Sequence, residues 1–166
     1  MLAEVCVSMV LAVMFGAAAF AANNRLLMAV RDQKEQTAAT MMLQERLEKF
    51  RSFSYTNIAD KDYVKNNILK QANATTSEAA LNNLTEYVTV SGYTPSGSYT
   101  PDPSNDYNRW IRDDSHRDGH EQNHNDQLAT NYDLLKVDIV ITWTGSNGRT
   151  RTRELASIFG KGNIGQ

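Results

Sequence analysis

The feature that most constrains this chain is a long stretch without helix breakers at its start. Residues 3–53 hold no proline and a single glycine, Gly16, and from residue 23 onward they are rich in good helix formers. This stretch predicts one helix over about residues 3–53, which at 1.5 Å per residue would be roughly 75 Å long. Because that length exceeds the diameter of a small domain, half of the helix must project from the rest of the protein or lie in a membrane.

The first half of this helix is apolar. Residues 5–22 carry no charge, and about eighteen residues could cross roughly 27 Å of hydrocarbon. The same run could be the core of a cleavable secretory signal, because Ala-Phe-Ala at residues 19–21 offers a small-x-small cleavage site. Signal peptides carry positive charge ahead of their apolar run, whereas Glu4 precedes this one and the first cation, Arg25, follows it. The flanks therefore favour a membrane-spanning segment over residues 1–22.

We expect the helix to continue as an amphipathic rod over residues 23–53. Apolar residues recur there at intervals near three and four, which lays a stripe along one side of the helix. The stripe consists of Leu26, Val30, Ala38, Met41, Leu47 and Phe50. Residues 54–166 then remain for one small globular head, enough for a single core but not for two domains.

The carboxylate at the apolar tip, Glu4, is a candidate assembly residue. A carboxylate inside a spanning segment costs several kcal/mol unless it is paired. Glu4 could lie at the headgroup level and reach water, or it could pair with a cation of another molecule inside a helix bundle. Small residues follow along the same helix, namely Gly16, Ala17, Ala18 and Ala19. They could let helix backbones approach closely, or they could be ordinary small residues of a membrane segment.

Two segments resemble a known family. Residues 1–27, MLAEVCVSMVLAVMFGAAAFAANNRLL, resemble the N-terminal segment of type IV pilins and type II secretion pseudopilins, where a glutamate precedes an apolar stretch and a long helix. Residues 37–58, TAATMMLQERLEKFRSFSYTNI, are similar to the matching region of minor pilins of the pilus-modification kind. In the family, one more residue precedes the glutamate, and a short basic leader ending in glycine precedes that. We expect either a true start upstream of Met1 or a mature chain lacking its first residue.

The resemblance implies a non-enzymatic structural subunit, a minor pilin or pseudopilin of a type IV pilus or type II secretion-like filament. Glu4 would pair with the N-terminal amine of a neighbouring subunit. The chain would be stored in the inner membrane as a single-pass protein with a periplasmic head, and would assemble by helix bundling into a periplasmic or extracellular filament. Its partners would be other pilin or pseudopilin subunits, the inner-membrane assembly platform and, if an upstream leader exists, a prepilin peptidase.

A hairpin is predicted near the C-terminus, over about residues 135–159. Residues 135–143 alternate apolar and polar side chains, Gly-Ser-Asn-Gly at 145–148 forms a turn by composition, and residues 149–158 give a return strand. An arginine row on the return strand could bind an acidic surface, but we expect it to be a solvated edge that discourages strand addition. The row consists of Arg149, Arg151 and Arg153.

The rest of the head is predicted to hold one more strand and two short helices. The strand covers residues 86–93, the helices cover 61–71 and 77–84, and the proline-containing residues 94–108 form a loop. Together these elements predict an α+β fold, in which a small antiparallel β-sheet packs on the C-terminal half of the long N-terminal helix.

Composition excludes some functions. The 166 residues carry a formal net charge of −2, so no basic face suggests a nucleic-acid partner. The single cysteine, Cys6, lies in the apolar segment, so the head cannot form an internal disulfide.

A metal-binding pattern lies within residues 112–127, RDDSHRDGHEQNHNDQ. His120 and His124 match the HExxH motif, in which two histidines one helical turn apart bind zinc, and His116 would extend the histidine face. Every neighbour is polar or glycine, so a catalytic helix would have nothing to exclude water. We expect a solvated loop without a cofactor, while structural or adventitious metal binding stays an alternative. A calcium loop is another, from the acids Asp113, Asp114, Asp118, Glu121 and Asp126.

Two further functions stay open at this point. A signal-anchored periplasmic binding or sensory module would use the helix only as a tether, so Glu4 would be dispensable. A membrane-tethered zinc hydrolase would bind stoichiometric zinc. No pattern in the chain indicates which filament system it serves or what the head binds.

Overall fold

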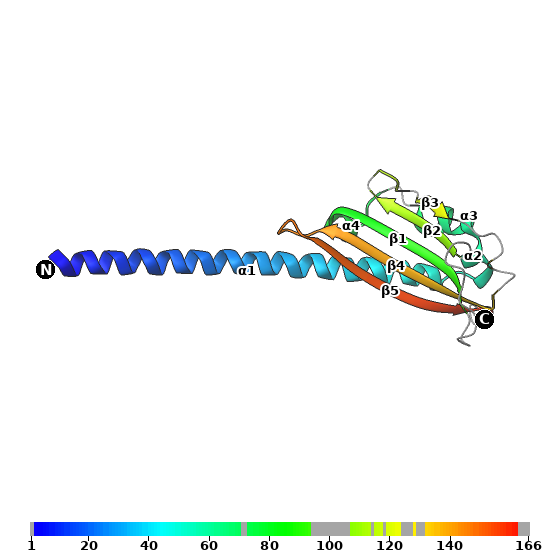
Figure 1. The fold of residues 1–166 in the computed structure, drawn as a ribbon, viewed down its shortest axis with the longest axis horizontal. Coiled ribbons are helices and arrows are strands. Elements are labelled where there is room, and N and C mark those ends of the chain that lie inside the picture. Colours follow the sequence, from blue (N-terminus) through cyan, green and yellow to red (C-terminus); the bar gives the residue numbers. More distant parts are fainter. Residues whose placement is uncertain are drawn as a thin grey trace.

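Helix α1 (Leu2–Arg51) and a five-stranded antiparallel sheet dominate the α+β fold of the computed structural model (Figure 1). The N-terminal half of α1 projects alone, and the sheet lies along its C-terminal half (Figure 1). The predicted fold class is therefore confirmed. The structure describes residues 2–70, 73–93, 107–113, 115–117, 119–123, 128 and 132–162.

The sheet has the strand order β3-β2-β1-β4-β5, and every neighbouring pair is antiparallel. The strands are β1 (Asn82–Tyr93), β2 (Tyr107–Asp113), β3 (His120–Asn123), β4 (Leu134–Thr144) and β5 (Thr150–Gly160). The predicted strand at residues 86–93 and the predicted C-terminal hairpin, formed by β4 and β5, are both confirmed.

Strands β2 and β3 occupy positions where the sequence predicted loops. The predicted loop at residues 94–108 is wrong at its end, because Tyr107 and Asn108 begin β2. The predicted loop at residues 112–127 is wrong at Arg112 and Asp113, which complete β2, and at residues 120–123, which form β3. The buried positions of β2 are Asn108, Trp110 and Arg112, so polar side chains hide the usual alternation. Residues 94–106 and 124–127 lie outside the described residues.

One face of the sheet and one side of α1 share a single hydrophobic core. Strand β4 points every second residue into it, from Leu135 to Trp143, and α1 contributes Ala39 and Phe50, both fully buried. The C-terminal half of α1 is thus part of the head, and its helical conformation is stabilised by tertiary packing.

The predicted apolar stripe on α1 is only partly correct. Ala38, Leu47 and Phe50 are buried, whereas Leu26, Val30 and Met41 are exposed. The side of α1 that faces the sheet instead continues through three other residues, which are Ala39, Met42 and Leu43. Leu26 and Val30 precede the part of α1 that packs under the sheet, and Met41 lies on the side of α1 that faces away from the core.

Four short helical segments connect α1 to the sheet. They are α2 (Tyr55–Ala59), α3 (Lys61–Tyr63), the π-helix η1 (Val64–Leu69) and α4 (Thr76–Ala79). Segments α3 and η1 confirm the helix predicted at residues 61–71 over most of its length. The helix predicted at residues 77–84 is wrong beyond Ala79, because β1 begins at Asn82. Thr75 and Glu78 form a capping box that starts α4.

Candidate functional site: the apolar half of α1 and its junction with the head

The apolar half of α1 lies outside the core of its own chain. Every side chain from residue 4 to residue 31 is exposed, and Phe15 is the most open of its large apolar residues, at 83 %. The helix is long and apolar enough to cross a membrane, and its most apolar window is not buried at all, unlike the core helix of a soluble protein. An exposed apolar surface of this size is typical of segments that contact lipid or another protein.

Glu4 lies in the first turn of α1, at the end of this apolar surface. A carboxylate in the first turn interacts favourably with the helix dipole. Glu4 also borders a shallow, open hollow on the helix surface, whose other lining residues are Val5, Ser8, Met9 and Ala12. The acid is therefore presented together with apolar neighbours, which suits contact with another apolar helix that carries a cation. Its pairing with a neighbouring subunit stays a prediction.

Among the described residues, nothing packs against the small residues further along the helix. A Cβ added at Gly16 would meet no atom within 4 Å, and Ala17, Ala18 and Ala19 are exposed. The head therefore does not require a glycine at this position. Close approach of a second helix would use it, and the packing role of residues 16–19 likewise stays a prediction.

The β4–β5 turn attaches to α1 where the helix leaves the head. The backbone N–H of Ser146 donates to Glu35 Oε1 at 3.0 Å, and the Ser146 hydroxyl donates to Asp32 Oδ1 at 3.0 Å. Arg151 Nη2 donates to Asp32 Oδ2 at 2.6 Å, and Arg153 Nη2 donates to Gln36 Oε1 at 3.0 Å. The hydrogen bonds from Arg151 and Ser146 lower the pKa of the Asp32 carboxyl. We call this set of contacts the hairpin strap.

The hairpin strap corrects the prediction for the arginine row at one position. Arg151 is partly buried and binds Asp32, so it is not part of a solvated edge. The prediction failed there because β5 runs beside a helix that presents Asp32. Arg149 and Arg153 are exposed, as predicted, although Arg153 also donates to Gln36.

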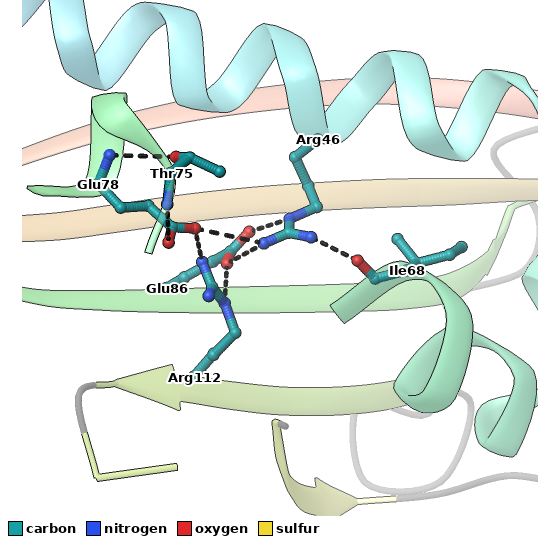
Figure 2. A network of polar contacts seen from close by, with 6 residues as sticks. All are labelled: Arg46, Ile68, Thr75, Glu78, Glu86 and Arg112. Atoms are coloured by element: carbon teal, nitrogen blue, oxygen red, sulfur yellow. Dashed lines mark hydrogen bonds and ion pairs between the residues drawn. The ribbon is translucent and has the colours of Figure 1, made fainter. Parts of the chain in front are cut away.

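A buried network of four charged side chains joins α1 to the sheet nearer the C-terminal end of the helix (Figure 2). Glu86 on β1 accepts two hydrogen bonds from Arg46 on α1, with N–O distances of 2.6 and 2.8 Å. Arg112 on β2 donates from Nε to Glu86 Oε2 at 2.7 Å and from Nη2 to Glu78. Arg46 also donates to the carbonyl oxygen of Ile68. The four side chains are at most 6 % exposed.

The network is electrically balanced, since two guanidiniums face two carboxylates. Burial by itself raises the pKa of Glu86, but Arg46 and Arg112 outweigh that effect and hold its pKa below the ordinary value. Burial likewise lowers the pKa of Arg112, but Glu86 and Glu78 outweigh it and raise that pKa. The charged forms of Glu86 and Arg112 are therefore favoured, and the four side chains satisfy one another's hydrogen bonds.

This buried charged network was not predicted from the sequence. The signal lay in the spacing along α1, where Arg46 falls between the buried positions 43 and 47. A cation at such a position, in a head that also has acids at 78 and 86, is a sign of a buried ion pair. The partners could not be assigned without the strand register that places Glu86 opposite Arg112.

The histidines of the HExxH pattern are not arranged as in a zinc protease. His120 and Glu121 lie on strand β3, where successive side chains point to opposite faces. Glu121 Oε1 lies 4.0 Å from Lys61 Nζ, whereas the ring of His120 lies beside that of His116. His124 lies outside the described residues. Of the proposed calcium ligands, Asp113 caps a turn by accepting from the N–H groups of residues 115 and 116, and Asp114, Asp118 and Asp126 are not described.

The described part of the chain contains no group of three or more His, Cys, Asp or Glu side chains that could hold a metal ion. Comparisons of the chain with family models, with curated proteins and with solved structures give no match. The feature that best indicates a function is therefore the exposed apolar half of α1, which continues without a break into the half that packs in the head.

Proposed function

We propose that this chain is a non-enzymatic structural subunit, a minor pilin or pseudopilin, of a type IV pilus or type II secretion-like filament. The observation that supports the proposal is that one continuous helix has a half buried in the head and an exposed apolar half. Its C-terminal half is a core element of the head, and its N-terminal half is exposed, apolar and tipped by an acid. A simple tether would need neither the rigid continuation into the head nor a carboxylate near its apolar end.

The physical role of the apolar half is to move between two apolar surroundings. In the inner membrane it lies among lipid tails, and in a filament it packs against the same segment of neighbouring subunits, so that little apolar surface meets water. Glu4 then sets the register, because a carboxylate in an apolar bundle is tolerated only beside an opposite charge. The head remains outside the bundle and faces the periplasm or the exterior.

Replacement of Glu4 tests the proposal. Glu4→Gln keeps the shape of the side chain and removes its charge, so we expect normal membrane insertion but loss of the chain from sheared or purified filaments. The matched control is Glu48→Gln, which removes an exposed carboxylate from the head end of the same helix. The control should assemble normally.

Membrane fractionation and quantitative immunoblots of the filament fraction are the two measurements. Equal incorporation of Glu4→Gln and the wild type would contradict the assembly role and would favour a signal-anchored binding or sensory module. Release of the head as a soluble protein cut near residue 21 would contradict both.

A further inference from the structure

His116 and His120 lie close together on the head, far along the sequence from α1. Their ring centroids are 5.6 Å apart, with the ring planes tilted by 47°. Two imidazoles that bind one zinc ion at about 2.0–2.1 Å have ring centres on the order of 5 Å apart. The pair therefore already has the separation that a shared metal ion requires.

A carboxylate orients the first of these rings. His116 Nδ1 lies 3.2 Å from Asp113 Oδ1, so the neutral ring carries its proton on Nδ1 and keeps the lone pair of Nε2 for a ligand. Asp113 is itself held by the N–H groups of Ser115 and His116, both at 2.8 Å. Metal-binding histidines commonly donate their second ring nitrogen to a carboxylate in this way, which fixes the tautomer and the ring orientation.

The backbone brings the second ring back toward the first. Gly119 donates its N–H to the carbonyl of His116 and has a φ of +80°, a left-handed conformation that favours glycine. A Cβ at this position would also press on the side chain of Leu69, at 3.3 Å. His120 then starts β3 with its side chain on the face opposite Glu121.

We propose that His116 and His120 form a surface site for a divalent transition-metal ion that prefers imidazole, such as Zn²⁺ or Cu²⁺. Among the described residues, no group of three or more His, Cys, Asp or Glu side chains could hold the ion, so the proposed site would leave positions for water or for a ligand from another molecule. From the sequence, a solvated loop without a cofactor was expected here, with structural or adventitious metal binding as an alternative. This site is independent of the proposed assembly role.

Calorimetric titration of the full chain in detergent with ZnCl₂ tests the proposal, provided that the protein carries no polyhistidine tag. We expect one binding event per chain, lost in both His116→Ala and His120→Ala. Asp113→Asn keeps an acceptor for the two turn N–H groups but removes the charge, and should weaken binding about 10-fold or more. Titration with Cu²⁺ followed by electron paramagnetic resonance should show two nitrogen ligands.

Further controls distinguish specific zinc binding at His116 and His120 from nonspecific binding elsewhere on the protein. Circular dichroism and thermal melting first establish that each variant folds like the wild type. Glu121→Gln, a change on the opposite face of β3, is the matched control and should bind as the wild type does. Binding that survives in His116→Ala or His120→Ala, or that disappears in Glu121→Gln, would overturn the assignment to this pair, as would the absence of any binding by the wild type.

Discussion

The side chain of Arg46 connects the long helix to the buried charged network in the core. It is 3 % exposed and makes a two-point contact with Glu86, while Arg112 holds the other side of the same carboxylate. Removing one member of such a network leaves an uncompensated buried charge, which is far more destabilising than loss of an exposed pair. Two arginines of α1 allow this difference to be measured.

Arg46→Met should lower the free energy of unfolding of the head by about 3–5 kcal/mol, because Glu78 and Glu86 would then share Arg112 as their remaining hydrogen-bonded cation. Arg51→Met is the control, since Arg51 pairs with Glu48 on the surface and its loss should change stability by about 0–1 kcal/mol. Denaturant unfolding of both variants in detergent, followed by tryptophan fluorescence, makes the comparison. Similar values for the two would show that the buried network does not support the fold.

Glu86 should also make the head sensitive to acid. Its native pKa lies below its ordinary value, so its stabilising contribution is present above the ordinary value of 4.5 and is lost as pH falls through the native pKa. Glu86→Gln should therefore be less stable than the wild type at neutral pH and lose less stability below pH 4.5. Melting temperatures measured between pH 7 and pH 3 test this. Glu154→Gln, an exposed change of the same kind on β5, should follow the wild-type profile.

At the scale of elements, the helices and strands that could be predicted from the sequence were those marked by a regular pattern of apolar residues. The unbroken helix and the β4–β5 hairpin were predicted, because residues 3–53 lack breakers and β4 alternates from Leu135 to Trp143. Strand β2 was missed because two of its three buried side chains, Asn108 and Arg112, are polar. Their burial is satisfied by partners distant in sequence, such as the carbonyl oxygen of Ala59 for Asn108, and no local pattern encodes these partners.

The candidate functional site was likewise predicted only in part. The apolar segment and Glu4 were visible in the sequence, whereas the hairpin strap was not, because Ser146 and Arg151 lie more than 100 residues from Asp32. The histidine pair was seen as part of a motif and expected on a solvated loop, whereas His120 begins strand β3 and Gly119 turns the chain so that the two rings lie together.

The hairpin strap should hold the turn and the start of β5 against α1. Asp32→Ala removes the acceptor of both Arg151 and Ser146, so we expect faster amide exchange at residues 146–153 with little change in the global melting temperature. Lys34→Ala, an exposed change two residues away, is the control. Hydrogen–deuterium exchange with mass spectrometry measures the effect, and unchanged exchange in Asp32→Ala would show that core packing alone holds the hairpin.

At the scale of the whole molecule, the proposal requires the head to lie on the periplasmic side of the inner membrane. The cations Arg25, Arg31 and Lys34 all follow the apolar segment, a distribution that by itself favours a cytoplasmic head. The orientation of the precursor expressed from its own gene is therefore a stringent test.

Cysteine labelling can determine that orientation, because Cys6 is the only cysteine. In a Cys6→Ser background, Thr152→Cys places a thiol at an exposed position of β5. We expect a membrane-impermeant maleimide to label it in cells whose outer membrane alone has been made permeable. Labelling only after the inner membrane is lysed would place the head in the cytoplasm and contradict the proposed filament role.

The unbroken course of α1 from its apolar tip to Phe50 has a mechanical consequence. Among the described residues, no linker separates the exposed apolar part of α1 from the part that packs under the sheet. If neighbouring subunits hold the apolar part as proposed, tension on it would reach the head as shear along the helix–sheet contact, where the Arg46–Glu86 and Asp32–Arg151 pairs would both resist sliding. The proposed filament would then transmit load to the folded core through the helix itself.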